Sequence, residues 1–320
     1  MSVGQERVRR EDLGMRSDLY SMLLPFFPDA GGLREYHTSL DGYEIRITAD
    51  DPKIPIATAQ DRKVLNLLAG TLAQSIRSGN PPSRHVVVDT RTMVETLSDG
   101  RQLGGAQYNL IIDRLKRLMS TVIETEMPLG DDHKRRRRFR WIDAYEHDDK
   151  DLPAGRKMLG LRITISEDAF YWMTRTLGFD ISRSNFHSIT SYRSSIWRIY
   201  EICLVRLIAR RGEPVHISIE DLRARVPITS ALKLFKSRTL KTAFEEIPKN
   251  PEMSQHIKVE LTKKVGDVFE PIEFSQRAKL QNIYVRVSRG HGTLPPLNTI
   301  LAKSEIDSMM DDSGGQNMSV

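Results

Sequence analysis

The chain has a single cysteine, Cys203, in 320 residues. An internal disulfide is therefore impossible, and the thiolate pairs of the common structural zinc sites are missing. The eight histidines are scattered, with no two at His-x-His spacing, which argues against the metal-dependent nicking enzymes that start rolling-circle replication. No Gly-x-x-x-x-Gly-Lys-Ser/Thr phosphate-binding loop occurs. The sequence predicts a protein that is not an enzyme, with no catalytic residue, metal or cofactor.

Long apolar runs are also missing. No stretch approaches the length of a transmembrane helix, and the amino terminus is charged, without an apolar signal segment. Hydrophobic residues make up 39% of the chain and charged residues 28%, as in ordinary soluble proteins. The net charge of +6 suits a polyanionic partner. We expect a bacterial cytoplasmic protein with no membrane contact and, from its length, two modest domains.

Residues 191–287 follow the element order of a winged helix, which is helix, strand, helix, helix, hairpin. The first helix is amphipathic, because one stripe carries its apolar side chains: Ile196, Tyr200, Cys203, Leu204, Leu207 and Ile208. Cys203 is thus expected in the core. A short β-branched strand then leads to Ser218, a good cap for the second helix. A third helix and strands over residues 256–263 and 268–274 complete the pattern.

The third helix is expected to read DNA. Its inner face carries Leu240, Ala243, Phe244 and Ile247, and its outer face is rich in Lys, Arg, Ser and Thr. Lys and Arg side chains can pair with guanine, and hydroxyls can reach phosphates or bases. The predicted contact residues are Lys233, Lys236, Ser237, Arg238, Thr239, Lys241 and Thr242. The alternative interpretation is an ordinary solvated basic face.

A similar pattern occurs upstream. Residues 58–76 carry an apolar stripe, residues 85–88 form a short strand, and Asp89 stands where Ser218 caps its helix. A further helix opens at Gly104-Gly105, and a strand is expected from Thr121. Duplication of such a unit indicates two related domains, although two helix-strand-helix segments can also resemble each other by chance.

The densest basic run of the chain lies where the hairpin of this upstream unit is expected. It comprises Lys134, Arg135, Arg136, Arg137, Arg138 and Arg140. Such a run can lie along the phosphate backbone, with an affinity that is electrostatic and sensitive to salt. The alternative is a disordered, solvated loop whose charge is partly neutralised by nearby aspartates.

The predicted class is α+β, with two tandem winged-helix domains. We expect a partly mobile amino-terminal arm over residues 1–32 and a first winged helix over residues 33–178, for dimerisation and accessory DNA contact. A second winged helix over residues 179–290 would make the principal DNA contact. Beyond Gly290 the chain turns to Gly, Pro and Ser, and residues 291–320 are expected to form a flexible tail.

Several short sequence segments resemble segments of the replication initiator protein A group and of related plasmid initiators that bind repeated sites, and they occur in the same order along the chain. Residues 191–202 resemble the helix that begins the DNA-binding winged helix of these proteins, residues 217–223 resemble the Ile-Ser-Ile-Glu-Asp-Leu-Arg phrase that follows, and residues 235–247 resemble their recognition helix. Near the amino terminus, residues 24–27 and 56–61 resemble the opening of the group.

The resemblance implies a non-enzymatic plasmid replication initiator. Such proteins bind repeated double-stranded DNA sites at an origin, help to open the adjacent duplex, and recruit host initiator and replicative helicase proteins. They commonly repress their own promoter as homodimers. The alternative is a winged-helix transcriptional regulator without initiator activity. An initiator should prefer direct repeats and melt neighbouring DNA, whereas a repressor should prefer an inverted repeat and leave the duplex closed.

Overall fold

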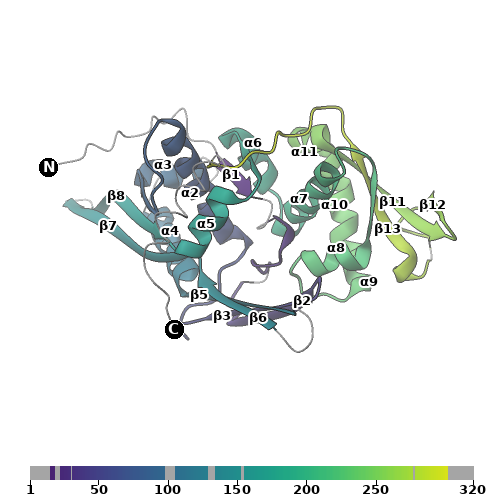
Figure 1. The fold of residues 1–320 in the computed structure, drawn as a ribbon, viewed down its shortest axis with the longest axis horizontal. Helices are drawn as coiled ribbons and strands as arrows, with labels where there is room; N and C mark the ends of the chain where they lie inside the picture. Colours follow the sequence, from purple (N-terminus) through teal and green to yellow (C-terminus); the bar gives the residue numbers. More distant parts are fainter. Residues whose placement is uncertain are drawn as a thin grey trace, which may run out of the picture.

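The structure is a computed structural model that describes residues 15–18, 22–29, 31–97, 105–128, 134–152, 155–276 and 278–301. Helices and antiparallel sheets make up both halves of the molecule (Figure 1), which confirms the α+β class. The amino-terminal half runs from β1 to α6 and the carboxy-terminal half from α7 to β13. One continuous apolar core joins the two halves.

In the carboxy-terminal half the elements follow the predicted order. Its helices are α7 (Ser194–Ala209), α8 (Ile219–Arg225), a run formed by α9 (Leu232–Leu234), η2 (Phe235–Leu240), α10 (Lys241–Glu246) and η3 (Ile247–Lys249), and then α11 (Pro251–His256) and η4 (Leu280–Asn282). Its strands are β10 (Val215–Ser218), β11 (Ile257–Val265), β12 (Val268–Pro271) and β13 (Ile283–Arg289), in the sheet order β10-β13-β11-β12. The Ser218 hydroxyl accepts a hydrogen bond from the Asp221 backbone amide at 3.1 Å, as expected of a residue that caps the start of α8.

The amino-terminal half contains the upstream pattern and further strands. Its helices are α2 (Ala59–Arg77), α3 (Thr90–Leu97), α4 (Gly105–Ser120), α5 (Glu167–Arg175) and α6 (Arg183–Thr190). Its strands are β1 (Met15–Asp18), β2 (Glu35–Leu40), β3 (Tyr43–Ala49), β4 (His85–Val88), β5 (Thr121–Pro128), β6 (Lys134–Arg140), β7 (Ile142–Leu152), β8 (Gly155–Ile165) and β9 (Gly178–Ile181). The short strand β4 pairs with β8 as β10 pairs with β13, so the two halves share this arrangement.

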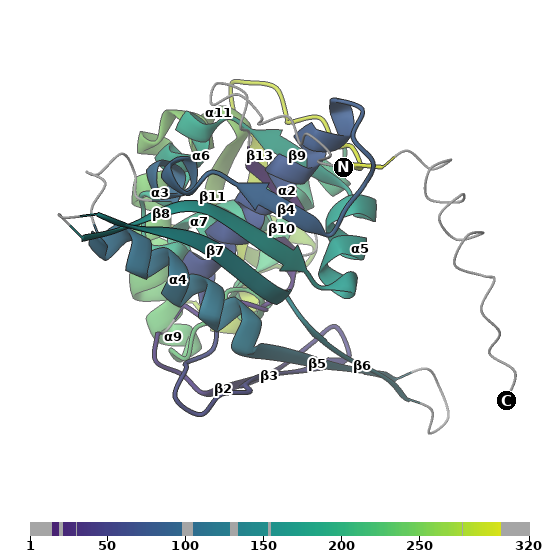
Figure 2. The same ribbon diagram turned by 90° about the vertical axis from the view of Figure 1, so that its left-hand side faces the viewer.

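The basic run does not form the hairpin that accompanies β4, contrary to expectation. That hairpin is β7–β8, in the sheet β4-β8-β7, whereas β6 lies at the edge of a separate sheet of order β2-β3-β5-β6. Figure 2 shows the two sheets as distinct layers. The cause is a long-range pairing: β3 binds β5 along its length, so the hairpin β2–β3 near the amino terminus draws β5 and β6 away from β4.

A buried ion pair joins the two halves at the contact between α2 and α7. Arg62 of α2, whose side chain is only 2% exposed, donates to Glu201 of α7 and lies over the Trp197 ring at 4.5 Å. The Arg198 guanidinium stands 3.7 Å from the same carboxylate and donates to the Leu24 carbonyl at 2.6 Å. Two buried cations and one carboxylate thus fix the contact between the helices.

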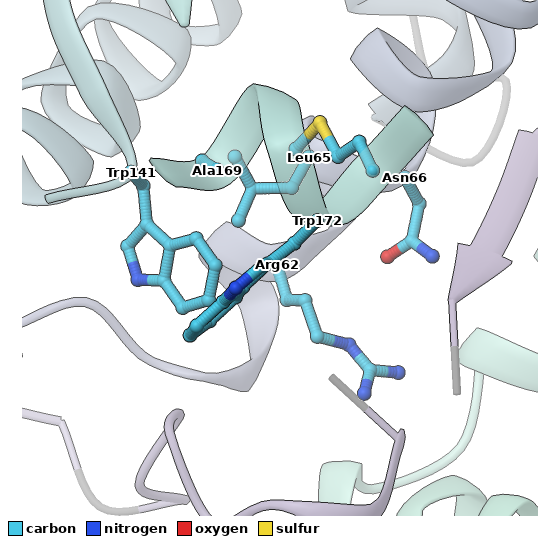
Figure 3. A pocket seen from close by; sticks show the side chains of 7 residues that line it. Arg62, Leu65, Asn66, Trp141, Ala169 and Trp172 are labelled. Carbon is cyan, nitrogen blue, oxygen red and sulfur yellow. The ribbon is translucent and has the colours of Figure 1, made fainter. Parts of the chain in front are cut away.

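A small cavity lies beside this ion pair. Figure 3 shows Arg62, Asn66, Trp141 and Trp172 around it. Its free space of about 10 Å³ is the size of one water molecule. The cavity is therefore a packing feature of the contact between α2 and α5, too small for an organic ligand.

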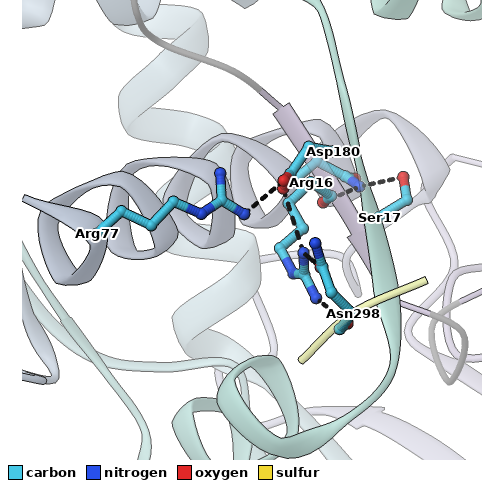
Figure 4. Close-up of polar contacts among 6 residues, drawn as sticks. Arg16, Ser17, Arg77, Asp180 and Asn298 are labelled. Atoms are coloured by element: carbon cyan, nitrogen blue, oxygen red, sulfur yellow. Dashed lines mark hydrogen bonds and ion pairs between the residues drawn. The ribbon is translucent and has the colours of Figure 1, made fainter. Parts of the chain in front are cut away.

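The segment after β13 returns to the amino-terminal half and docks there. Arg16 is buried and donates to the side-chain oxygen and the carbonyl of Asn298, each at 2.6 Å, and to Asp180 at 3.2 Å, as Figure 4 shows. Asn298 pairs with Gly178, and Leu301 is buried. The expectation of a flexible tail is therefore wrong for residues 291–301, because a charged side chain 282 positions away anchors them. Residues 302–320 lie outside the described part.

We expect Arg62→Ala to lower the free energy of unfolding by about 3 kcal/mol, because it leaves the Glu201 carboxylate buried with only the more distant Arg198. The matched control is Arg46→Ala, which breaks an exposed pair with Glu35 at 2.8 Å and should cost about 1 kcal/mol or less. Denaturant titration followed by tryptophan fluorescence measures both. Equal losses in the two variants would contradict a special role for the buried pair.

Arg16→Ala should release the docked segment. The amides of Ile300 and Leu301 donate to the Thr174 carbonyl, and they should exchange hydrogen about tenfold faster or more once the charged hydrogen bonds to Asn298 are removed. Arg77→Ala is the matched control, since Arg77 shares Asp180 at 2.5 Å but makes no contact with Asn298. Unchanged exchange in Arg16→Ala would show that the segment is held by its apolar contacts alone.

Candidate nucleic-acid interface

The helical run from Leu232 to Lys249 buries its predicted inner face. Leu240, Ala243 and Ile247 are buried, and Phe244 is half-buried with its ring edge-to-face on Phe274 at 5.2 Å. The remaining face of the run is open to solvent. The run therefore has the amphipathic form that the sequence indicated.

A π-helical turn interrupts the run at Phe235–Leu240, which the sequence did not reveal. The wider turn holds more residues than an α-turn, and both Ser237 and Arg238 are exposed while Phe235 and Leu240 stay buried. Such turns are frequent at functional sites. The hydrophobic periodicity of the sequence does not reveal a π-turn, because the turn adds only one residue to an otherwise helical pattern.

Most of the predicted contact residues lie on the open face. Lys233, Ser237, Arg238 and Lys241 are exposed, whereas Thr239 and Thr242 are partly buried. The Thr242 hydroxyl donates to the Arg238 carbonyl at 2.8 Å, and Lys241 stands 4.0 Å from Glu245. Neither Lys233 nor Arg238 makes a side-chain hydrogen bond or ion pair with another described residue. Their charges therefore remain available to a partner.

Lys236 departs from this pattern. It is only 9% exposed, and its ammonium donates to the Gln276 carbonyl at 3.4 Å. Desolvation lowers the pKa of Lys236. Lys236, although a predicted contact residue, therefore does not lie on the open face: the π-turn directs it inward, where it ties the loop after β12 to the helix. Its contact with DNA stays a prediction.

The β11–β12 hairpin extends beyond this helix at the right-hand end of the molecule in Figure 1. Its base is held by a ring stack in which Phe269 lies on His216 at 3.8 Å and edge-on to Tyr284 at 5.1 Å. Burial and the charge of Arg286 lower the pKa of His216, which favours the neutral ring in this stack. The hairpin is thereby fixed to the rest of its sheet.

Two further cations, missed in the sequence, lie on this hairpin. Lys263 and Lys264 precede the turn and form no ion pair within the described ranges. The sequence signal that could have identified them is the pair of lysines shortly before a Gly-Asp turn. Together with Lys233 and Arg238, they form a set of cations that make no ion pair with a described carboxylate. This set lies on the helical run and on the β11–β12 hairpin of the carboxy-terminal half.

The arginines of β6 are mostly paired with carboxylates. On the outer face of the sheet, Arg136 stands 2.7 Å from Glu126 and Arg138 stands 3.4 Å from Glu124. At the strand's end, Arg140 stands 2.5 Å from Asp50. The glutamates are the register neighbours of these arginines across β5. Their charge is therefore largely balanced within the sheet.

The other face of β6 turns toward the core. Phe139 is buried, and Arg137 donates to Asp168 and lies 5.4 Å from the Trp172 ring centre. Arg135 is exposed. The side chain of Lys134 lies outside what the structure describes. The strand is thus neither a loop nor a uniformly free cationic surface, and its contact with phosphates stays a prediction.

The helix of the amino-terminal half that corresponds to the predicted reading helix is α4. Its exposed side chains include Asn109, Leu110, Asp113 and Lys116, and its Arg117 is held by Asp61 at 2.8 Å. This face is not basic. The cationic helix face is therefore a property of the carboxy-terminal half.

The described residues hold no group of three His, Cys, Asp or Glu side chains that could bind a metal ion. Cys203 is buried, which raises the pKa of its thiol to about 12. In the same part of the chain no helix has the length and apolar character to cross a membrane.

Comparison with known proteins identifies a family. No protein of curated function matches the sequence. Two crystal structures of domains 2 and 3 of RctB, one of them a selenomethionine derivative, are similar to the chain at 12% and 13% sequence identity, with TM-scores of 0.49 and 0.48. Each comparison covers 86% of this chain and 97% of the other. The sequence profile of replication initiator protein A matches residues 16–249, which is well over half of the chain, and the protein therefore belongs to this family.

Proposed function

We propose that the protein is a plasmid replication initiator that binds repeated double-stranded DNA sites at an origin through its carboxy-terminal half. The observation that carries the proposal is the set of cations without carboxylate partners on the helical run and the adjacent hairpin, which are Lys233, Arg238, Lys263 and Lys264. Such cations are free to replace the counterions of phosphates, and the release of those counterions drives DNA binding. Family membership supports the role in replication.

In this proposal residues 179–290, which include the whole carboxy-terminal half, form a winged helix. The run Leu232–Glu246 is its recognition helix and β11–β12 its wing. Residues 33–178 form a second winged helix, with α4 as the counterpart of the recognition helix and β7–β8 as the counterpart of the wing. The first domain serves dimerisation and makes accessory DNA contacts, in keeping with the lack of a basic face on α4. Residues 1–32 are an amino-terminal arm, of which Phe26 and Phe27 are buried in the core.

The family role leads to the remaining parts of the proposal. The bound protein promotes opening of adjacent origin DNA, recruits the host initiator and replicative helicase, acts without enzymatic activity of its own, and represses its own promoter as a homodimer. Footprinting of the full-length protein on DNA flanking its gene, with permanganate probing of unpaired thymines, tests this. Protected direct repeats beside reactive thymines support the proposal. An inverted repeat that stays closed would instead identify a transcriptional regulator.

Arg238→Ala should weaken binding to the footprinted site by about 1–3 kcal/mol, if its guanidinium pairs with a base, and should relax the preference at one base position. Lys241→Ala should add to the loss. Lys249→Ala is the control, because this exposed lysine at the end of the run is not among the predicted contact residues and stands 3.0 Å from Glu246. Fluorescence anisotropy with the site and with single-base variants measures the effect. Intact binding by the Arg238/Lys241 double variant would refute the assigned helix face.

The salt dependence of binding separates the free cations from the paired ones. Lys263→Ser with Lys264→Ser should lower the slope of log affinity against log salt by about 0.9 for each phosphate that the variant no longer neutralises. Arg136→Ser with Arg138→Ser should change the slope by less, because Glu126 and Glu124 already neutralise these arginines. A decrease of about 0.9 per arginine would establish β6 as the phosphate-binding surface after all.

A further inference from the structure

The tip of the β11–β12 hairpin exposes apolar side chains that the fold does not use. Val265 and Val268 face each other across the Gly266-Asp267 turn and are 43% and 62% exposed. Gly266 has a φ of +60°, the left-handed conformation that suits glycine in a tight turn. Val268 is the most exposed large hydrophobic residue in the described part of the chain. The turn therefore holds an apolar pair at the outermost point of the hairpin.

The distribution of exposed apolar residues supports a role for this tip. Within described residues 178–301, the large hydrophobic side chains that are exposed are Leu234, Val265 and Val268. All three lie on the helical run or on the hairpin, the two elements proposed to contact DNA. The other exposed large hydrophobic residues in the described part of the chain are spread over the amino-terminal half and include Val87, Leu110 and Leu177.

The hairpin is packed against the rest of the fold next to its tip. Phe269, the neighbour of Val268, is clamped between His216 and Tyr284. The loop that follows β12 is fixed to the helical run by Phe274 on Phe244 and by the Lys236 ammonium on the Gln276 carbonyl. The position of the tip is thus coupled to the position of the helix.

The charges behind the tip identify its partner. Lys263 and Lys264 stand directly before Val265 and form no ion pair of 4.0 Å or less among the described residues. Lys263 is the register partner of Glu270 on β12, and the Lys264 ammonium lies 5.9 Å from the centre of the Phe269 ring. An apolar point with cations behind it matches a minor groove, where apolar wedges separate base steps while cations contact the phosphates on either side. Asp267 lies in the turn and opposes the approach to phosphates, so it weakens the contact.

We propose that Val265 and Val268 form a wedge that enters the minor groove beside the site bound by the helix, partly unstacks one base step and bends the DNA. The proposal rests on the proposed function, since it requires the carboxy-terminal half to bind duplex DNA. It adds a property that base recognition by the helix does not supply, namely local distortion of the neighbouring duplex.

The test compares Val265→Ser/Val268→Ser with Val87→Ser, a matched exposed valine, 49% exposed, on β4 of the other half. The probe is the duplex that the full-length wild-type protein selects from random sequence. Energy transfer between labels at the duplex ends reports bending, and 2-aminopurine placed at successive flanking positions reports unstacking. Thermal unfolding confirms that each variant is folded, and the two single Val→Ser variants replace the double variant if it is not.

The wild type and Val87→Ser should bend the duplex and brighten one 2-aminopurine position. The double variant should lose that signal, bend the DNA less and bind about tenfold more weakly. Asp267→Asn should bind a few-fold more tightly than the wild type, because it removes a charge that phosphates repel. Loss of the 2-aminopurine signal together with the bend supports the wedge.

Unchanged bending and unstacking in the double variant would overturn the wedge, including the case in which the tip contacts a protein instead. The proposed function would still stand if Arg238→Ala abolished binding in the same assay. If the wild type selected no duplex at all, the proposed function and the wedge would both fail. The two ideas therefore fail by different results.

Discussion

The buried ion pair between Arg62 and Glu201 determines how the two halves of the molecule meet. Both charges lie between α2 and α7, the long central helices of their halves, and both are almost inaccessible to water. A buried pair gains little net stability over apolar residues of the same size, but a misaligned pair leaves an uncompensated charge in the core. The Trp197 ring and Arg198 complete its surroundings, and the Lys63 ammonium donates to the Thr190 carbonyl at 3.1 Å. The pair therefore selects one arrangement of the halves, and the helix and hairpin of the carboxy-terminal half take their place from it.

Whether a cation is paired with a carboxylate indicates its availability to an external polyanion better than the density of basic residues along the chain does. The run from Lys134 to Arg140 is the most basic stretch of the sequence, but Arg136, Arg138 and Arg140 face carboxylates across their own sheet. Exposed pairs of this kind add little stability, yet they lower the charge available to an external polyanion. Lys233, Arg238, Lys263 and Lys264 are spread over 32 positions and form no dense run, but they belong to two elements that are joined through the loop after β12, where Phe274 packs on Phe244. Proximity in the fold, combined with the lack of carboxylate partners, separates the second set from the first.

The sequence was sufficient for features that depend on near neighbours. Helical periodicity located α2, α4 and α7, and the Ser218 cap followed from one residue and its position. Features set by distant partners were missed. The pairing of β3 with β5 joins strands more than 70 residues apart and moved β6 out of the expected hairpin, and Arg16 anchors Asn298 from the opposite end of the chain. At the candidate site, the inner face of the helical run was predictable, but the π-turn and the inward direction of Lys236 were not. Both arise where the packing of Phe235, Leu240 and the loop after β12 overrides the regular helical register.

Lys236 changes how the site can act as a unit. Its ammonium holds the Gln276 carbonyl, and Phe274 packs on Phe244, so the loop after the hairpin is fixed to the helical run at two points. The stack of His216, Phe269 and Tyr284 fixes the other side of the hairpin to the sheet. A rigid connection means that a helix seated in one groove places the hairpin tip at a set distance along the duplex. In the proposed complex, base recognition and distortion of the flanking DNA would then be linked by geometry, without any conformational change in the protein. In that complex, free energy gained at the helix offsets part of the cost of unstacking a neighbouring step, because the contacts at Phe274 and Gln276 connect the hairpin to the helical run.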